Sequence, residues 1–187
     1  MNRLNHFFWG FFLLLVLATA CSEETTPDPI DPPVIQPEAG VLISNEGGFG
    51  FNNASLSFYH FTDQTVSNQL FQNANDRPMG DVLQSITLHE EKLYLVMNNS
   101  NKIEVVDPET FQTLSTISPF NSPRYLLPLD NQKAYLTDLY EDKMYVVDLA
   151  NERINTTIEL EGWTEELLLF QDRVFVSNRE SKYVFVI

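Results

Sequence analysis

Residues 92–117 read KLYLVMNNSNKIEVVDPETFQTLSTI, and this stretch decides the fold. β-Branched and aromatic residues gather in short runs, which are separated by the Asn, Ser, Asp and Pro residues typical of turns. With the segment just upstream, the pattern predicts four consecutive strands at 85–89, 93–97, 102–106 and 113–117. One four-stranded antiparallel sheet is therefore expected here.

The same pattern recurs along the chain at a fixed step. Residues 92–96 (KLYLV) return as KAYLT at 133–137, which is 41 positions on, and as RVFVS at 173–177, which is 40 further on. The next strand keeps the step, because KIEVVD at 102–107 returns as KMYVVD at 143–148. A period near 40 with four strands per unit indicates a β-propeller, in which each sheet is one blade. A β-sandwich is the alternative, but it does not explain so regular a recurrence.

Counting the units predicts an all-β fold, a partial β-propeller over residues 41–187. The expected blades lie at about 41–83, 84–123, 124–164 and 165–187, and the last stops inside its third strand. This makes the chain a fragment of about three and a half four-stranded blades, since a ring of seven such units would need roughly 290 residues. No amphipathic helix is expected in this part of the chain.

The first 40 residues predict an exported, anchored protein. Residues 1–6 hold one Arg and no acid, residues 7–18 are almost wholly apolar, and small residues precede Cys21, which is the layout of a signal peptide over residues 1–20. About 12 apolar residues are too few for a permanent transmembrane helix, which needs roughly 20. Cys21, the only cysteine, is then the expected lipidation site, and a buried free thiol is the plainer alternative.

Residues 21–40 predict a Pro-rich tether between that lipid and the propeller. Five of the ten prolines lie here, and they favour extended chain that could reach roughly 50 Å from a membrane surface. The formal net charge of −15 becomes −16 when the signal and its single Arg are removed. We therefore expect no nucleic-acid partner, because phosphate binding draws its affinity from clustered Lys and Arg. The simplest interpretation of the acidic surface is that it keeps the protein soluble.

The predicted strand order gives the sheets two different ends. Short polar turns fall at one end, near residues 90–92, 107–110, 130–133 and 171–173. Longer segments rich in aromatic, amide and charged residues gather at the other, and we expect a binding surface there. The candidate ligand-binding residues on it are Asn45, Glu46, Phe49, Asn53, Asp81, Asn98, Arg124, Asp138, Tyr140, Trp163 and Asn178.

The longer segments also carry a resemblance to a known family. The resemblance lies in residues 43–47 (ISNEG), 52–57 (NNASLS), 80–85 (GDVLQS), 122–125 (SPRY) and 137–140 (TDLY). In them the chain resembles the surface-exposed, seven-bladed YVTN-type propeller lipoproteins of Bacteroidota, which capture vitamin B12 and other corrinoids. The resemblance implies a lipid-anchored protein on the outer face of the outer membrane that passes its ligand to a TonB-dependent transporter. An acidic run after Cys21, at 22–24, resembles the surface-export signal of such lipoproteins.

A corrinoid offers many amides and a nucleotide tail, and it suits amide and aromatic partners better than strong charge. Hydrogen bonds from an amide such as Asn53 contribute about 0.5 to 1.5 kcal/mol each, and burial of an aromatic such as Phe49 roughly 1.5 to 3 kcal/mol. Arg124 is expected beside Asp81 and Asp138, where it would meet a phosphate or amide oxygen.

Each of these residues has a structural alternative. The Asn residues are common turn formers, Trp163 could fill the gap between blades, and Arg124 could form a structural ion pair.

Catalytic and metal-binding patterns are not found in the sequence. The zinc-type Cys and His spacings, the Gly-x-Ser-x-Gly elbow and the EF-hand loop are missing, and Glu165 and Glu166 should point to opposite faces of a strand. We therefore expect no enzyme activity, no metal and no cofactor, with the corrinoid as ligand. Two alternatives stay open, a scaffold for protein docking or adhesion and a metal-dependent propeller hydrolase or lactonase.

Overall fold

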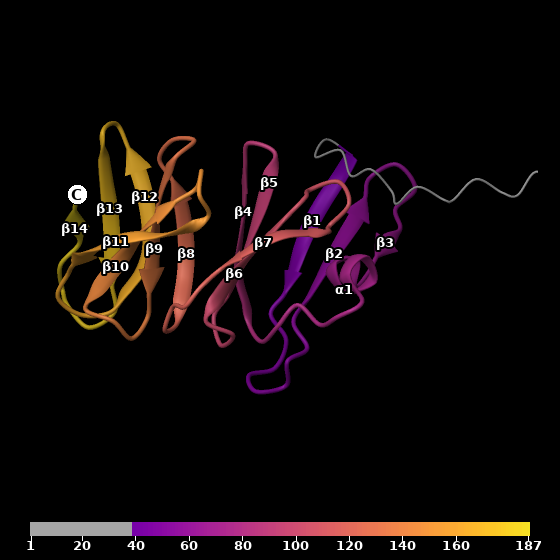
Figure 1. Ribbon diagram of the computed structural model, residues 1–187, viewed down its shortest axis with the longest axis horizontal. Coiled ribbons are helices and arrows are strands. Elements are labelled where there is room, and N and C mark those ends of the chain that lie inside the picture. The colour runs from indigo at the N-terminus through magenta and orange to yellow at the C-terminus, as the bar shows by residue number, and fades with distance from the viewer. Residues whose placement is uncertain (1–38) are drawn as a thin grey trace, which may run out of the picture. The chain divides into compact units, whose positions relative to one another are not determined.

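The computed structural model describes residues 39–187. Within this range, strands and one short helix follow one another along the chain, and the all-β prediction is confirmed (Figure 1). The predicted signal peptide, the lipidation of Cys21 and the tether up to residue 38 lie outside the described residues.

The strands form four antiparallel sheets in chain order. Sheet 1 contains β1 (Gly40–Asn45), β2 (Ser55–His60) and β3 (Val66–Ser67). Sheet 2 contains β4 (Leu83–His89), β5 (Lys92–Met97), β6 (Lys102–Val106) and β7 (Thr113–Ile117). Sheet 3 contains β8 (Pro123–Pro128), β9 (Lys133–Asp138), β10 (Lys143–Asp148) and β11 (Arg153–Glu159). Sheet 4 contains β12 (Thr164–Phe170), β13 (Arg173–Asn178) and β14 (Phe185–Val186). Each sheet begins within one residue of an expected blade start.

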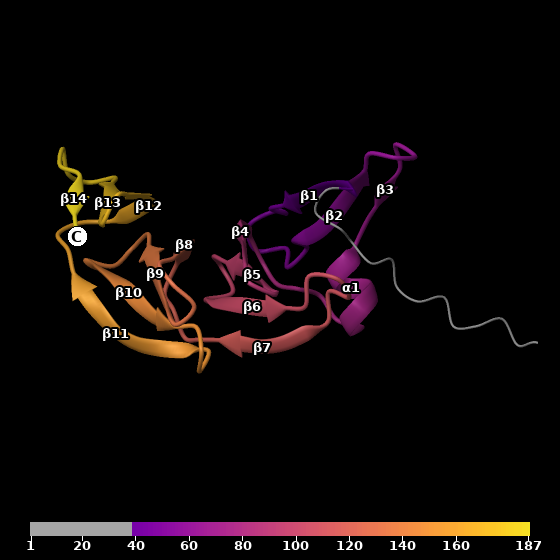
Figure 2. The same ribbon diagram turned by 90° about the horizontal axis from the view of Figure 1, so that it is seen from above.

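Consecutive sheets pack face to face, as in a propeller. Three apolar clusters lie between sheets 1 and 2, sheets 2 and 3, and sheets 3 and 4. The first strands β4, β8 and β12 adjoin one another, and Figure 2 shows β7 and β11 on the opposite edges of their sheets. The first strands therefore form the inner edge of the stack, and the last strands form its outer edge.

The middle strands are buried on both faces because each inner sheet has two neighbours. In β5, Leu93 and Leu95 pack toward sheet 1, whereas Tyr94 and Val96 pack toward sheet 3. Full burial of such a side chain contributes about 1.5 to 3 kcal/mol. The run of apolar residues in β5, with no alternation of polar and apolar side chains, follows from this double contact.

Sheet 1 differs from the expected four-stranded unit. β1 runs toward the end of the sheets at which β4 begins, because the Glu46 carbonyl accepts a hydrogen bond from the Leu83 amide. This is the direction of β5, and β1 pairs with β2 as β5 pairs with β6. β1 thus holds the second position of its sheet. The expectation of four strands in every unit is wrong here, since no described residue supplies a first strand.

A helix, α1 (Leu70–Asn75), follows β3, in a part of the chain where no amphipathic helix was expected. Leu70 and Phe71 are buried in the cluster between sheets 1 and 2. Six residues make fewer than two turns, so the sequence shows no helical periodicity. Tertiary packing of these two side chains, rather than propensity, stabilises the helix.

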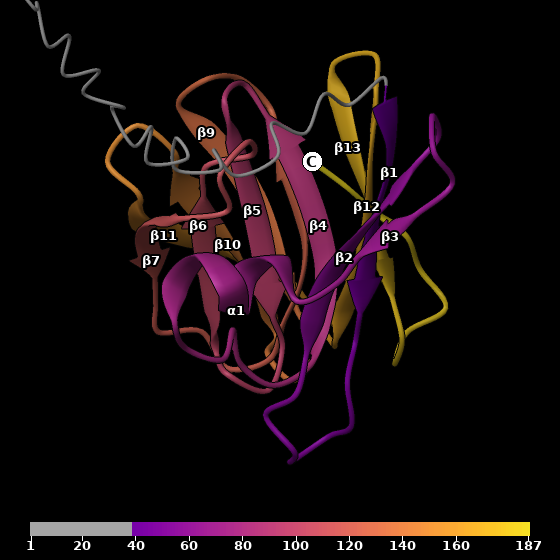
Figure 3. The same ribbon diagram turned by 90° about the vertical axis from the view of Figure 1, so that its right-hand side faces the viewer.

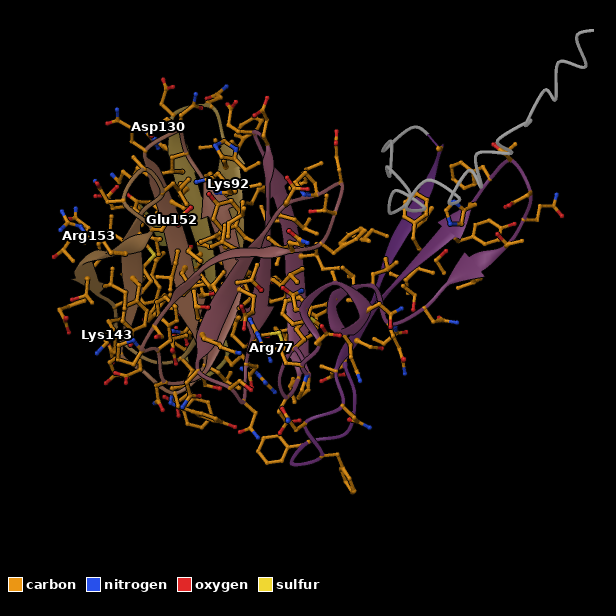
Figure 4. All side chains as sticks on the ribbon, turned by 45° about the vertical axis from the view of Figure 1, so that its right-hand side comes forward. Arg77, Lys92, Asp130, Lys143, Glu152 and Arg153 are labelled. Atoms are coloured by element: carbon orange, nitrogen blue, oxygen red, sulfur yellow. The ribbon has the colours of Figure 1, made fainter. Side chains whose placement is uncertain are left out.

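The two ends of the sheets differ as predicted. The turn end carries the short connections 90–91, 107–112, 129–132, 149–152 and 171–172. The loop-rich end carries 46–54, 76–82, 98–101, 118–122, 139–142, 160–163 and 179–184. At the turn end, an ion pair of 2.5 Å between Lys92 and Glu152 joins sheets 2 and 3 (Figure 4).

Candidate functional site

Backbone hydrogen bonds join the connections of the loop-rich end into a continuous rim. Just before β2 in sheet 1, the Ala54 amide donates a hydrogen bond of 3.2 Å to the Gly80 carbonyl, which precedes the start of sheet 2. Further along, the Phe120 amide donates to the Asn101 carbonyl and the Leu139 amide to the Ser122 carbonyl. These contacts satisfy polar backbone groups that would otherwise lie open at the sheet ends. The loops that the sequence assigned to a binding surface therefore do lie at one end of the fold.

The loop 46–54 presents two aromatic side chains to solvent. Phe49 is 73% exposed and Phe51 is 77% exposed, on the loop that extends furthest from the sheets in Figure 1. Gly47 has φ +81° and Gly50 has φ +83°, a backbone conformation that favours glycine. The Asn53 side chain accepts a hydrogen bond from the Gly48 amide at 2.8 Å. The loop is thus a defined turn that holds Phe49, which was predicted, and Phe51, which was not.

Asp81 fastens this loop to sheet 2. Its Oδ2 accepts the Gly50 amide at 2.7 Å and the Asn99 side-chain amide at 2.6 Å. The Asn99 hydrogen bond is the largest cause of a lowered pKa at Asp81. The carboxylate is buried beneath the loop, and its hydrogen bond with Gly50 holds in place the loop that carries Phe49 and Phe51.

A second aromatic group lies on the rim at sheet 3. The rings of Tyr140 and Trp163 meet edge to face, with centroids 5.1 Å apart and planes at 88°. Tyr140 is 57% exposed and Trp163 is half-buried. The indole is thus partly covered and partly accessible to solvent, so it can still contact a ligand.

The other predicted amides hold loops together. Asn45 donates to the Ser57 hydroxyl at 2.9 Å, and Asn98 donates to the Ser122 hydroxyl at 2.9 Å. Asn178 donates to the Glu161 carbonyl at 2.7 Å and accepts backbone amides from the loop that follows it. Their hydrogen bonds match the structural alternative for these residues, whereas Glu46 and Asn53 are exposed on the rim.

Asp138 has no exposed surface. Its carboxylate accepts backbone amides from Asn121 at 3.1 Å, Ser122 at 2.8 Å and Tyr140 at 3.3 Å. Burial raises the pKa of this carboxyl, against the effect of these hydrogen bonds. Asp138 therefore ties the start of sheet 3 to the loop that carries Tyr140, from below the surface.

Arg124 lies on β8 among polar side chains of the inner edge. Its guanidinium donates to the side chain of Gln84 on β4 and to the carboxylate of Glu165 on β12. The distance from Arg124 Nε to Glu165 Oε1 is 2.9 Å. The expectation that Asp81 and Asp138 flank it is not met. Instead, Gln84, Arg124 and Glu165 form a ladder across the first strands of sheets 2, 3 and 4, and the structural ion pair considered for Arg124 is present. Both partners stand about 40 residues from Arg124, at the equivalent place in the repeat, and that spacing was the signal that could have revealed them.

A cluster of metal-ligating side chains is not found in the described part of the chain. Within residues 39–187, no group of three His, Cys, Asp or Glu side chains is placed to hold an ion. His60 contacts Ser67 at 2.9 Å near the turn end, where His89 also lies. None of the helices in the described part is long and apolar enough to span a membrane.

Comparison with solved structures identifies the architecture. The chain is similar to Kuenenia stuttgartiensis hydrazine synthase, with a TM-score of 0.63 at 16% identity over 88% of this chain and 47% of that one. It is also similar to the WD40 β-propeller domain of Doa1, with a TM-score of 0.59 at 14% identity over 76% of this chain and 45% of that one. A protein of unknown function from Bacteroides caccae gives a TM-score of 0.55 at 12% identity, over 77% of this chain and 54% of that one.

The chain thus spans about half the length of these structures, and the likeness shows the propeller fold alone. A search of curated proteins finds no match. The profile of a family described as a domain of unknown function, DUF5074, matches residues 39–187.

Proposed function

Because the chain belongs to the DUF5074 family, whose function is open, we propose from the rim that it is a lipid-anchored, surface-exposed binding protein for a corrinoid. The single observation that carries the proposal is the display of exposed aromatic side chains on fastened loops at one end of the fold. The sequence resemblance to corrinoid-capturing lipoproteins supports the choice of ligand. In this proposal the protein passes its ligand to a TonB-dependent transporter in the outer membrane.

The aromatic side chains provide the apolar contact that a flat macrocycle needs. Phe49, Phe51 and Tyr140 are all largely exposed, and each would contribute roughly 1.5 to 3 kcal/mol on full burial against a ligand. Because Asp81 and the loop hydrogen bonds hold the phenylalanines in place, little conformational entropy is lost when a ligand binds. Preorganised display of this kind favours binding over a passive surface role.

Polar groups beside the aromatic residues suit an amide-rich ligand. The exposed Asn53 amide can donate to a carbonyl, and the exposed Glu46 carboxylate can accept from an amide. Arg179 is exposed, with its guanidinium 4.0 Å from Glu165, and can meet a phosphate of a nucleotide tail. The charge of Arg124 is already balanced by Glu165, so the inner edge offers no strong attraction for anions.

Calorimetric titration of the mature protein with cyanocobalamin tests the proposal. We expect saturable heat, and a loss of affinity of about tenfold or more for Tyr140→Ala or Phe49→Ala, which corresponds to about 1.4 kcal/mol. The matched control is Phe61→Ala, because Phe61 is also exposed but follows β2 at the turn end. No heat with the parent protein, or equal losses in all three variants, would refute the rim as a corrinoid site.

A protein-docking scaffold is the second candidate, and the prominence of Phe49 and Phe51 favours it. Exposed aromatic side chains on a fixed loop are also suited to an apolar pocket of a partner protein. Co-purification of an outer-membrane protein without added ligand, lost in a Phe49→Ala and Phe51→Ala double variant, would favour this function. Retention of the partner by that variant would speak against it.

A further inference from the structure

A cavity separate from the rim lies on the outer side of the fold, between sheets 1 and 2. Its volume is about 530 Å³, within the range of about 300 to 1,000 Å³ typical of small-molecule sites. The end of β3, helix α1 and the turn from β6 to β7 line it, and Figures 2 and 3 show α1 close to β7. All of its lining comes from residues 67–112, from the end of β3 to the turn before β7.

The walls of the cavity are held by side-chain hydrogen bonds. Asn75 at the end of α1 donates to the Phe111 carbonyl at 2.8 Å and accepts from the Thr113 amide at 2.8 Å. On the other wall, Asp107 accepts the Thr110 amide at 2.7 Å and the Glu109 amide at 3.0 Å. Because helix and turn are joined to each other and braced internally, the space between them is a fixed feature of the fold.

The lining combines an apolar floor with polar side chains at its edge. Leu70 and Phe111 are buried and form part of the floor, with Ala74 beside them. Asn68, Asn73, Gln112 and Glu109 are exposed around it. The Gln112 amide can both donate and accept hydrogen bonds. Asn68 accepts from the Ser57 hydroxyl at 2.8 Å and keeps its side-chain N–H donors, whereas Asn73 donates to the Asn68 carbonyl at 3.3 Å and keeps its side-chain oxygen as an acceptor. The Glu109 carboxylate only accepts. No Lys or Arg lines the cavity.

This chemistry selects a class of ligand. A carboxylate without a nearby cation in the lining disfavours an anionic ligand, because like charges repel at short range. Amides and a carboxylate bind hydroxyl groups well, and the apolar floor can contact the C–H face of a ring. We propose that the α1 cavity binds a neutral, hydroxyl-rich ring compound of the saccharide class, independently of any ligand at the rim.

Nuclear magnetic resonance titration of the ¹⁵N-labelled mature protein tests this proposal. The probes are D-glucose, D-galactose, D-mannose and N-acetyl-D-glucosamine, with D-glucuronate as the anionic counterpart. We expect at least one neutral sugar to shift the amide signals of residues 68–75 and 109–112 in a saturable manner. Glucuronate should bind more weakly, and Glu109→Gln should reduce that difference.

Matched variants separate binding from an effect on folding. Gln112→Ala and Asn73→Ala should each weaken sugar binding by about tenfold or more, whereas Gln132→Ala, at an exposed position in the turn that follows β8, should leave it unchanged. Unaltered dispersion of all other signals shows that the variants are folded. No shift in the two segments with any probe, equal affinity in all three variants, or tighter binding of glucuronate would overturn the proposal. Cyanocobalamin titrated in parallel reports on the rim alone, so failure of one site is distinguishable from failure of the other.

Discussion

The buried carboxylate of Glu104 gives the sharpest stability prediction. Only 1% of its side chain is exposed, and the Arg77 guanidinium donates two hydrogen bonds to its carboxylate oxygens, each 3.0 Å long. Lys102 lies 2.5 Å from Oε1, and the Thr116 hydroxyl donates to Oε2 at 3.2 Å. Arg77 precedes β4 and Glu104 lies on β6, so this contact ties the segment after α1 to the middle of sheet 2.

Replacing Arg77 with alanine should destabilise the protein by about 3 kcal/mol at neutral pH. Loss of one partner of a buried ion pair costs about 3 to 5 kcal/mol, and the lower value applies because Arg77 is 39% exposed and Lys102 remains. For a domain of this size, 1 kcal/mol lowers Tm by about 2 to 4 °C, so Tm should fall by about 6 to 12 °C. Thermal unfolding followed by circular dichroism measures the difference.

The pH dependence distinguishes this cause from a loss of packing. Burial alone would raise the pKa of Glu104, but hydrogen bonds from Arg77 and Lys102 hold it below the ordinary value of 4.5. The folded state thus gains stability from this group above pH 4.5 and loses it as pH falls through the lowered pKa. The difference between parent and Arg77→Ala should therefore shrink at acid pH, and an additional Glu104→Gln change should recover part of the loss at neutral pH. A constant difference between neutral and acid pH would refute the electrostatic explanation.

Two further predictions concern the core and the rim. Leu95→Ala removes a side chain with no exposed surface from the cluster between sheets 1 and 2, and should cost about 2 to 5 kcal/mol in a urea unfolding experiment; a cost below 1 kcal/mol would mean that the sheets do not pack as described. Asp81→Ala removes the anchor of Gly50, so hydrogen exchange should accelerate in loop 46–54 but not in β9; unchanged exchange in the loop would show that Asp81 does not hold it.

The repeat of the sequence was sufficient to predict sheets 2, 3 and 4, because strand pairing and sheet packing impose the same pattern on each of these units. The step from Lys92 to Lys133 and Arg173 marks the start of β5, β9 and β13. Strand direction then decides which connections share an end, and the rim loops were predicted on that basis. These features follow from local pattern and chain direction alone.

Other features depend on contacts that no local pattern reveals. Helix α1 is too short to show a period, and the place of β1 in its sheet follows from which strand pairs with it. The partners of Arg124 come from neighbouring sheets, about 40 residues away in each direction. The side-chain amide of Asn53 is exposed to solvent, whereas that of Asn98 is buried against a neighbouring loop. Packing between the sheets decides this difference.

The direction of β1 separates the point at which the chain enters the fold from the rim. The polypeptide enters its first sheet at the turn end, so the aromatic side chains of the rim occupy the opposite pole. Under the proposed function, an anchor upstream of β1 would act at the turn end, where the chain enters sheet 1, and would leave the loops of the rim free to meet a ligand.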